Sequence, residues 1–138
     1  MFIHAIFLNG EVVVMKPLSK HILLELSGCE FNFLNDLDFV KDTMRNAALE
    51  ANTEVLELAF HKFSPQGVSG VVVISESHLS IHTWPEYGYA AIDVFTCGDK
   101  TMPEKVSRYL KKKFQAKTIY KTTVIRGILK NNIYVHKI

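Results

Sequence analysis

The chain has 138 residues, of which 48% are hydrophobic and 22% charged, the balance of one soluble globular domain. A formal charge of +2, from 16 basic and 14 acidic residues, gives no reason to expect nucleic acid or a membrane surface as partner. No apolar run reaches the roughly 18 residues of a membrane-spanning helix, and the first residues lack the features of a secretory leader. We therefore expect a cytoplasmic protein in which Cys29 and Cys97 are reduced thiols, with a disulfide between them as the alternative.

The first fourteen residues form a distinct unit. Residues 2–8 and 11–14 are apolar and β-prone, and Asn9-Gly10 between them favours a two-residue hairpin turn. We expect either a β-hairpin here or an extension that precedes a true start at Met15. In both cases residues 15–138 make up one domain.

The next part of the chain predicts a strand, a helix and a second strand. Residues 21–26 have the composition of a buried strand. Asn35 or Asp36 can cap a helix that runs to about Ala51, with apolar residues at helical spacing. Residues 54–63 alternate, which places Leu56, Leu58 and Phe60 on one face of the strand and Glu57, His61 and Phe63 on the other.

The second half predicts further strands around one more helix. Strands are expected at residues 68–75, 79–83 and 89–96, with a turn at residues 85–88. Thr101 and Glu104 have the spacing of a capping box, and Pro103 suits the first turn of a helix. The apolar stripe of that helix is Val106, Tyr109, Leu110 and Phe114. Residues 117–125 and 133–136 are expected to be closing strands.

This order of elements predicts an α+β fold, a two-layer sandwich. Strands that are joined by short turns pair antiparallel, so we expect one largely antiparallel sheet with two main helices on one face. The other face also needs a cover, and a homodimer that packs sheet against sheet provides one.

Residues 69–97 concentrate the side chains that can do chemistry: four serines, two histidines, one cysteine and the only tryptophan. His78 and His82 as metal ligands are disfavoured, because their four-residue spacing suits a helix and this segment has the pattern of a strand. Cys97 with His82 or His61 is a second reading, as a nucleophile and its base. The third is that these residues are ordinary core.

A longer pattern distinguishes these readings. Residues 74–86, Ile-Ser-Glu-Ser-His-Leu-Ser-Ile-His-Thr-Trp-Pro-Glu, resemble the self-processing segment of prokaryotic S-adenosylmethionine decarboxylases. Residues 60–63, 67–73 and 89–98 resemble the neighbouring motifs of that family. The resemblance runs from about Met15 to Ile128.

The resemblance implies that the chain is a proenzyme that cuts itself between Glu76 and Ser77, giving chains 1–76 and 77–138. Ser77 would attack its own preceding peptide bond and become a covalent pyruvoyl group, with no metal required. His82 matches the proton acceptor in processing. Ser69 matches a serine that assists the reaction by hydrogen bonding.

The resemblance also implies the decarboxylation chemistry. The substrate amine would form a Schiff base with the pyruvoyl ketone, which serves as an electron sink. Cys97 matches the family's proton donor to the substrate carbon. Phe63 matches an aromatic ring that stacks on adenine, and Glu86 matches a carboxylate that binds the ribose. The family is a homodimer with sites between protomers.

Three functions remain open at this point. The first is decarboxylation of S-adenosylmethionine for spermidine biosynthesis. The second is a pyruvoyl-dependent arginine or ornithine decarboxylase, because the processing segment alone does not separate these substrates. The third is a relative that no longer processes and binds a partner or ligand, although an intact Ser77 with His82 and Cys97 counts against it.

Overall fold

The computed structural model describes residues 4–97, 102–129 and 133–137. Its main body is a six-stranded antiparallel sheet in the order β4-β5-β6-β7-β3-β8. The strands are β3 (Ser19–Ser27), β4 (Val55–Lys62), β5 (Val68–Ile74), β6 (Ser77–Trp84), β7 (Tyr89–Cys97) and β8 (Thr118–Arg126). The helices are α1 (Phe31–Asn35), α2 (Leu37–Glu50) and α3 (Pro103–Lys113), with a 3₁₀ turn, η1, at Pro85–Tyr87.

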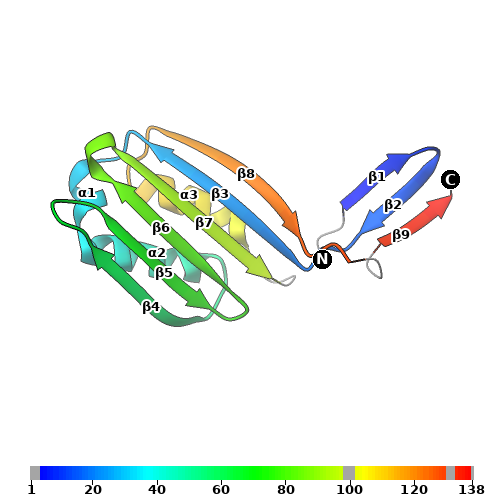
Figure 1. Ribbon diagram of the computed structural model, residues 1–138, viewed down its shortest axis with the longest axis horizontal. Coiled ribbons are helices and arrows are strands. Elements are labelled where there is room, and N and C mark those ends of the chain that lie inside the picture. The colour runs from blue at the N-terminus through cyan, green and yellow to red at the C-terminus, as the bar shows by residue number, and fades with distance from the viewer. Residues whose placement is uncertain (1–3, 98–101, 130–132, 138) are drawn as a thin grey trace.

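The helices lie behind the sheet in Figure 1, and no described helix covers the near face. The core fills the space between these two layers, because alternate strand residues point toward the helices. Fully buried examples from the sheet are Ile22, Leu79 and Val94, and from the helices Val40 and Leu110. The expected α+β sandwich with two main helices on one face is therefore confirmed.

The two main helices begin differently. Asp36 caps α2, since its carboxylate accepts a hydrogen bond from the Phe39 amide at 2.9 Å. At α3 the residue before the helix is Met102, which makes no side-chain cap, and Thr101 of the expected capping box lies outside the described residues. Glu104 is bonded instead to Lys20 of β3 at 2.5 Å and Lys121 of β8 at 2.6 Å, which ties the helix to the sheet.

The expected position of Leu56, on one face with Leu58 and Phe60, is wrong. A register shift between Val55 and Glu57 interrupts the β4–β5 ladder, and a bulge of this kind moves the following side chains to the other face. Leu56 is 55% exposed as a result, whereas Val55 and Leu58 pack against the core.

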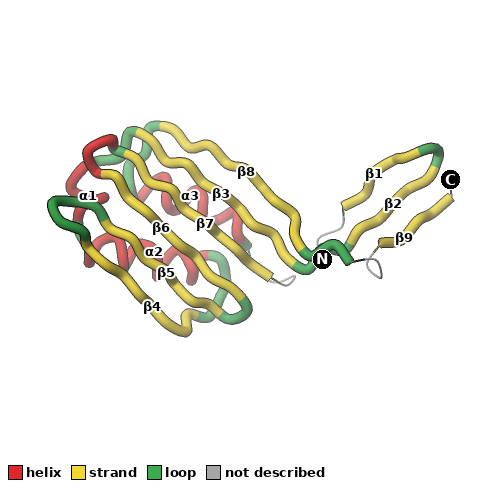
Figure 2. Tube along the Cα trace, in the orientation of Figure 1, coloured by secondary structure: helices red, strands yellow, loops and turns green. Residues whose placement is uncertain are grey.

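A second, three-stranded sheet stands apart from the main body, in the order β1-β2-β9 (Figure 2). Its strands are β1 (His4–Leu8), β2 (Glu11–Met15) and β9 (Ile133–Lys137). Asn9 and Gly10 join β1 to β2 with φ of 49° and 78°, the two left-handed positions of a type I′ turn. The last strand thus pairs with β2 and does not join the large sheet.

Candidate active site

Ser77 begins β6, directly after a two-residue turn. Ile74 and Ser77 are paired across the hairpin, so Ser75 and Glu76 form the turn. Glu76 has φ of 70°, a left-handed conformation that costs an ordinary L-residue about 1–2 kcal/mol. The Oγ of Ser77 is buried and makes no hydrogen bond within the described residues. A strained residue and an unbonded hydroxyl therefore flank the same peptide bond.

Cys97 is the last residue of β7 and lies at the same end of the sheet as Ser77. The register pairs His78 with Phe95, so Ser77 and Cys97 both lie just beyond that pair. The Cys97 side chain is half-buried, whereas Cys29 is 8% exposed. Burial raises the pKa of the Cys29 thiol to about 11, which makes it a poor source of thiolate. Both cysteines are free thiols.

Ser69 and His82 face each other across β5 and β6 near the opposite end. The Ser69 Oγ and the His82 Nδ1 are 2.8 Å apart, a hydrogen bond. His82 lies on the open face, because Leu79, Ile81 and Thr83 alternate with it and are buried. The serine therefore fixes the orientation of an imidazole that solvent or a second molecule can reach.

A cavity of about 330 Å³ adjoins this pair. Both residues expected to bind substrate, Phe63 and Glu86, line it together with Ser69 and His82. The Phe63 ring is 48% exposed and makes an edge contact with His61, with ring centroids 4.8 Å apart. Sequence reasoning did not select the other lining residues, which are Gln66, Gly67, Thr83 and Trp84.

These residues form two groups that do not meet within one chain. Ser77 and His82 are five positions apart on one strand, a separation of about 17 Å at 3.4 Å per residue. An odd separation also places their side chains on opposite faces. Glu76, Ser77 and Cys97 thus lie at one end of the sheet, and Ser69 and His82 lie toward the other with the cavity.

Between the two groups the open face carries a polar cluster that sequence reasoning missed. Asp93 on β7 accepts a hydrogen bond from the Ser80 hydroxyl at 2.9 Å, and its other oxygen lies 3.1 Å from the His21 Nε2. Phe95 packs against His21, and the Arg126 guanidinium lies 5.0 Å from the Phe95 ring centroid. Strict alternation along β7 was the available signal, because it places Asp93 and Phe95 on the face of Cys97.

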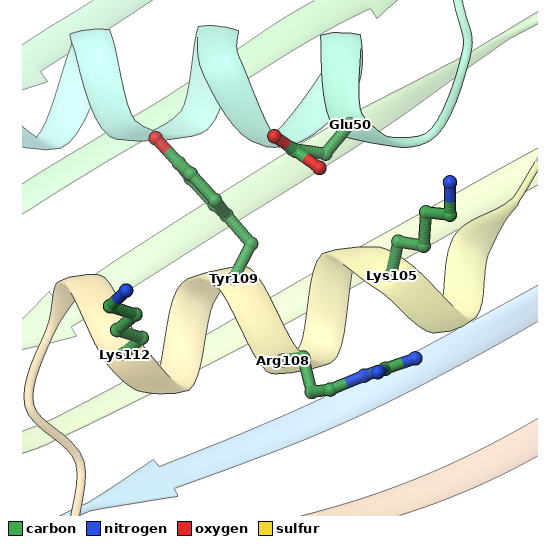
Figure 3. A pocket seen from close by; sticks show the side chains of 5 residues that line it. All are labelled: Glu50, Lys105, Arg108, Tyr109 and Lys112. Atoms are coloured by element: carbon green, nitrogen blue, oxygen red, sulfur yellow. The ribbon is translucent and has the colours of Figure 1, made fainter.

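A larger hollow of about 460 Å³ lies on the helix layer between α2 and α3. In Figure 3 Tyr109 extends from α3 toward α2, while Arg108 points away from α2. The lining residues are Glu50, Lys105, Arg108, Tyr109 and Lys112, and no predicted site residue is among them. Size therefore does not mark the active site here.

The described ranges contain no group of three or more His, Cys, Asp or Glu side chains arranged to hold a metal ion. Over the same ranges, each helix is too short or too polar to cross a bilayer.

Comparison with known proteins identifies the family of the chain. Residues 20–127 match the family model described as S-adenosylmethionine decarboxylase. The chain belongs to the S-adenosylmethionine decarboxylase family. Members of this family are pyruvoyl-dependent lyases that are made as proenzymes.

Individual relatives are similar over most of their length. The S-adenosylmethionine decarboxylase proenzyme of Pelotomaculum thermopropionicum is 61% identical over 115 residues, which cover 83% of this chain and 91% of the relative. That of Clostridium kluyveri is 54% identical over 121 residues, or 88% and 96% of the two chains. The crystal structure of the adenosylmethionine decarboxylase from Aquifex aeolicus superposes with a TM-score of 0.77 at 35% identity, covering 83% of this chain and 95% of that one.

Proposed function

We propose that this protein is an S-adenosylmethionine decarboxylase that cuts itself between Glu76 and Ser77 and completes its active site in a homodimer. The observation that carries the proposal is the state of Ser77, whose Oγ is buried without a partner beside the left-handed Glu76. A buried hydroxyl that makes no hydrogen bond costs about 1–3 kcal/mol. Such a cost, together with backbone strain, is typical of functional positions.

The cut begins at the peptide bond between these two residues. The Ser77 hydroxyl attacks the Glu76 carbonyl carbon, the C–N bond breaks, and the hydroxyl proton passes to the freed amine, which leaves an ester. Removal of the Ser77 α-proton then expels the Glu76 carboxylate by breaking the Cβ–O bond. The dehydroalanine that remains tautomerises and takes up water, releasing ammonia and leaving a pyruvoyl group at the start of chain 77–138.

His82 is the base in the second step. If its Nδ1–H donates to the Ser69 Oγ, the lone pair lies on Nε2, which is then free to accept a proton. Ser69 thus selects the useful tautomer, in addition to its expected role as a donor to the oxyanion formed in the first step.

The separation within one chain supports a second copy as the source of His82. Cys97 lies on the open face at the end of the sheet where Ser77 begins β6, whereas Ser69 and His82 lie toward the other end of that face. A two-fold axis that runs between two such faces, across the strands, places one end of each sheet against the opposite end of its partner. Two equivalent sites result, each with Ser77 and Cys97 from one copy and Ser69 and His82 from the other.

When present, the pyruvoyl group supplies an electron sink for the electrons left by carbon dioxide. The end of the sheet that carries the buried Ser77 hydroxyl and the nearby Cys97 thiol suits a pyruvoyl group. Cys97 donates a proton to the substrate carbon, and Phe63 and Glu86 bind the adenine and the ribose. The aromatic Phe63 also suits the positive sulfonium of the substrate.

The product of S-adenosylmethionine decarboxylation is the aminopropyl donor for spermidine. We place the enzyme in the cytoplasm, in keeping with two free thiols. The family match supports S-adenosylmethionine over arginine or ornithine as substrate. An assay of the purified protein with each of the three substrates tests this choice, and release of carbon dioxide from arginine or ornithine alone would overturn it.

The intact mass of purified protein tests the cut. We expect two chains, residues 1–76 and a pyruvoyl-capped 77–138, in the native protein and one uncut chain in Ser77→Ala. A single uncut chain in the native protein after long incubation would leave it without its cofactor and contradict the proposal.

A further inference from the structure

The small sheet is assembled from two parts of the chain that the family model does not include. The matched segment is 20–127, whereas β1 and β2 occupy residues 4–15 and β9 occupies residues 133–137. Yet β2 pairs with β9 over five consecutive positions, from Glu11 opposite Lys137 to Met15 opposite Ile133. The two additions therefore fold against each other.

The small sheet continues an existing strand pair. β3 and β8 are neighbours in the large sheet, with Ser19 opposite Arg126 at one end. β2 precedes β3 in the chain, and β9 follows β8. At the corner where both segments leave the large sheet, the Leu18 amide donates to the Gly127 carbonyl at 3.3 Å. The segments that continue β3 and β8 therefore pair with each other a second time in the small sheet, beyond this hydrogen-bonded corner (Figure 1).

The proposed cut at Glu76–Ser77 places the paired strands of the small sheet on two different chains. β1 to β5 belong to chain 1–76 and β6 to β9 belong to chain 77–138. In the large sheet the two chains meet where β5 pairs with β6 and where β3 lies between β7 and β8. In the small sheet they meet once more, between β2 and β9.

We propose that, after processing, the β1–β2 hairpin is the docking site for β9, so that the small sheet is a clasp between the two chains of the mature enzyme. Its partner is therefore the carboxy-terminal strand of the pyruvoyl-bearing chain. This inference rests on the proposed self-cleavage, and it assigns a role to residues 4–14.

The two halves of the clasp depend on each other. An isolated two-stranded hairpin is at best marginally stable in water, and a third strand is what makes a small sheet persist. β9 in turn has no other strand partner among the described residues. A chain that begins at Met15 retains one residue of β2, so β9 loses its partner there.

Hydrogen exchange on the processed enzyme tests the clasp directly. Among residues 133–137, we expect the amides that point toward β2 to be protected in the full chain and to exchange on the order of tenfold faster or more in a chain that begins at Met15. Amides of β3 and β8 serve as the internal control and keep their protection. Fast exchange of residues 133–137 in the full chain, or protection that survives in the shortened one, would overturn the proposal.

A point variant avoids the effects of truncation. Val13 lies in the middle of β2, between two paired strands. Val13→Pro removes a backbone donor and the strand geometry and is expected to release β9, whereas Val13→Thr keeps both and is the matched control. Equal exchange rates of the β9 amides in the two variants would contradict the proposed clasp.

Chain separation in urea tests the function of the clasp. A chain that begins at Met15 and a chain that ends at Asn132 are each expected to separate at a lower urea midpoint after processing. The chain with both truncations is expected to have no lower midpoint than either, since both truncations remove the same interaction. Additive shifts, or none, would contradict the proposal. The uncut Ser77→Ala chain shows the same exchange pattern if the pairing is right, so a failure of processing is distinguished from a failure of the clasp.

Discussion

Ser77 and His82 lie on the same strand, β6, but at its two ends and on opposite faces of the sheet. Their separation of about 17 Å excludes proton transfer between them within one chain. The Ser69–His82 hydrogen bond of 2.8 Å shows that the histidine is nevertheless held in a defined orientation. In the proposed reaction His82 is the base, and an oriented imidazole that lies far from Ser77 of its own chain is what a site shared between two copies requires.

The strain at Glu76 predicts how fast the chain cuts itself. Glycine adopts φ of 70° without the cost that Glu76 incurs, so Glu76→Gly removes strain from the precursor. We expect it to be cut at least several-fold more slowly, since about 1–2 kcal/mol corresponds to roughly five- to thirtyfold in rate.

Glu76→Gln is the matched control, because it keeps the strained backbone and removes only the charge. Intact-mass time courses of freshly made protein measure both rates. Cleavage of Glu76→Gly as fast as Glu76→Gln would show that the strain plays no part.

The two cysteines are expected to respond differently to substitution. Cys97→Ala should be cut into two chains but lose on the order of 10²–10⁴-fold in decarboxylation, the range of a general acid. Cys29→Ala should retain activity, because Cys29 is buried in the core and its amide bonds to the Gly88 carbonyl, at the end of β6 opposite to Ser77. Product formation by fully processed protein is the measurement, and equal losses in the two variants would contradict the assignment of Cys97.

Thiol alkylation provides an independent check on this pair. The pKa of Cys29 is raised to about 11 by burial, so its thiolate is scarce below that pH in the folded protein. We expect one thiol, Cys97, to be alkylated at pH 8, and Cys29 to react only in unfolded protein, where its pKa returns to about 9.0. Rapid alkylation of folded Cys29 at pH 8 would contradict its burial.

Glu104 predicts part of the acid sensitivity of the fold. Its hydrogen bonds to Lys121 and then Lys20 lower the pKa of the carboxyl below the usual 4.5. A lowered pKa stabilises the fold above about pH 4.5, and that contribution is lost as the pH falls through the pKa of the folded state. Because Glu104 is largely exposed, the effect is small, about 0.5–1 kcal/mol.

Urea unfolding of the uncut Ser77→Ala chain measures this effect without chain separation. Glu104→Gln is expected to lower the midpoint at pH 7 and to differ little from the parent at pH 3. Glu57→Gln, on the exposed edge strand β4, is the control and should change neither. If Glu104→Gln lowered the urea midpoint equally at pH 7 and pH 3, the lost stabilisation would not be ionic.

Much of this architecture could be predicted from sequence, because it depends on local signals. Asp36 predicted the start of α2, and alternation placed most strands. Leu56 was misplaced because a bulge in β4 reflects pairing with β5, which local spacing does not encode. Pairing of β2 with β9, residues more than a hundred positions apart, was missed for the same reason.

The candidate site shows the same division. Sequence resemblance selected Ser77, His82 and Cys97 as individual residues, but it gave no distances. Their distribution over two ends of the sheet follows from the hairpin registers of β5, β6 and β7. Asp93 was missed because a lone carboxylate in a strand has no distinguishing pattern until its partners, Ser80 and His21, are seen across the sheet.

The proposal of a site shared between two copies is tested most directly by mixing two inactive chains. A Ser77→Ala chain and a His82→Ala chain, made together with different tags and purified as the mixed dimer, have one site with both residues intact. We predict that the His82→Ala chain stays uncut alone and is cut when paired with Ser77→Ala. Pairing it with a chain that carries both substitutions is the control and should not rescue it. An uncut His82→Ala chain in the Ser77→Ala dimer would contradict a site built from two copies.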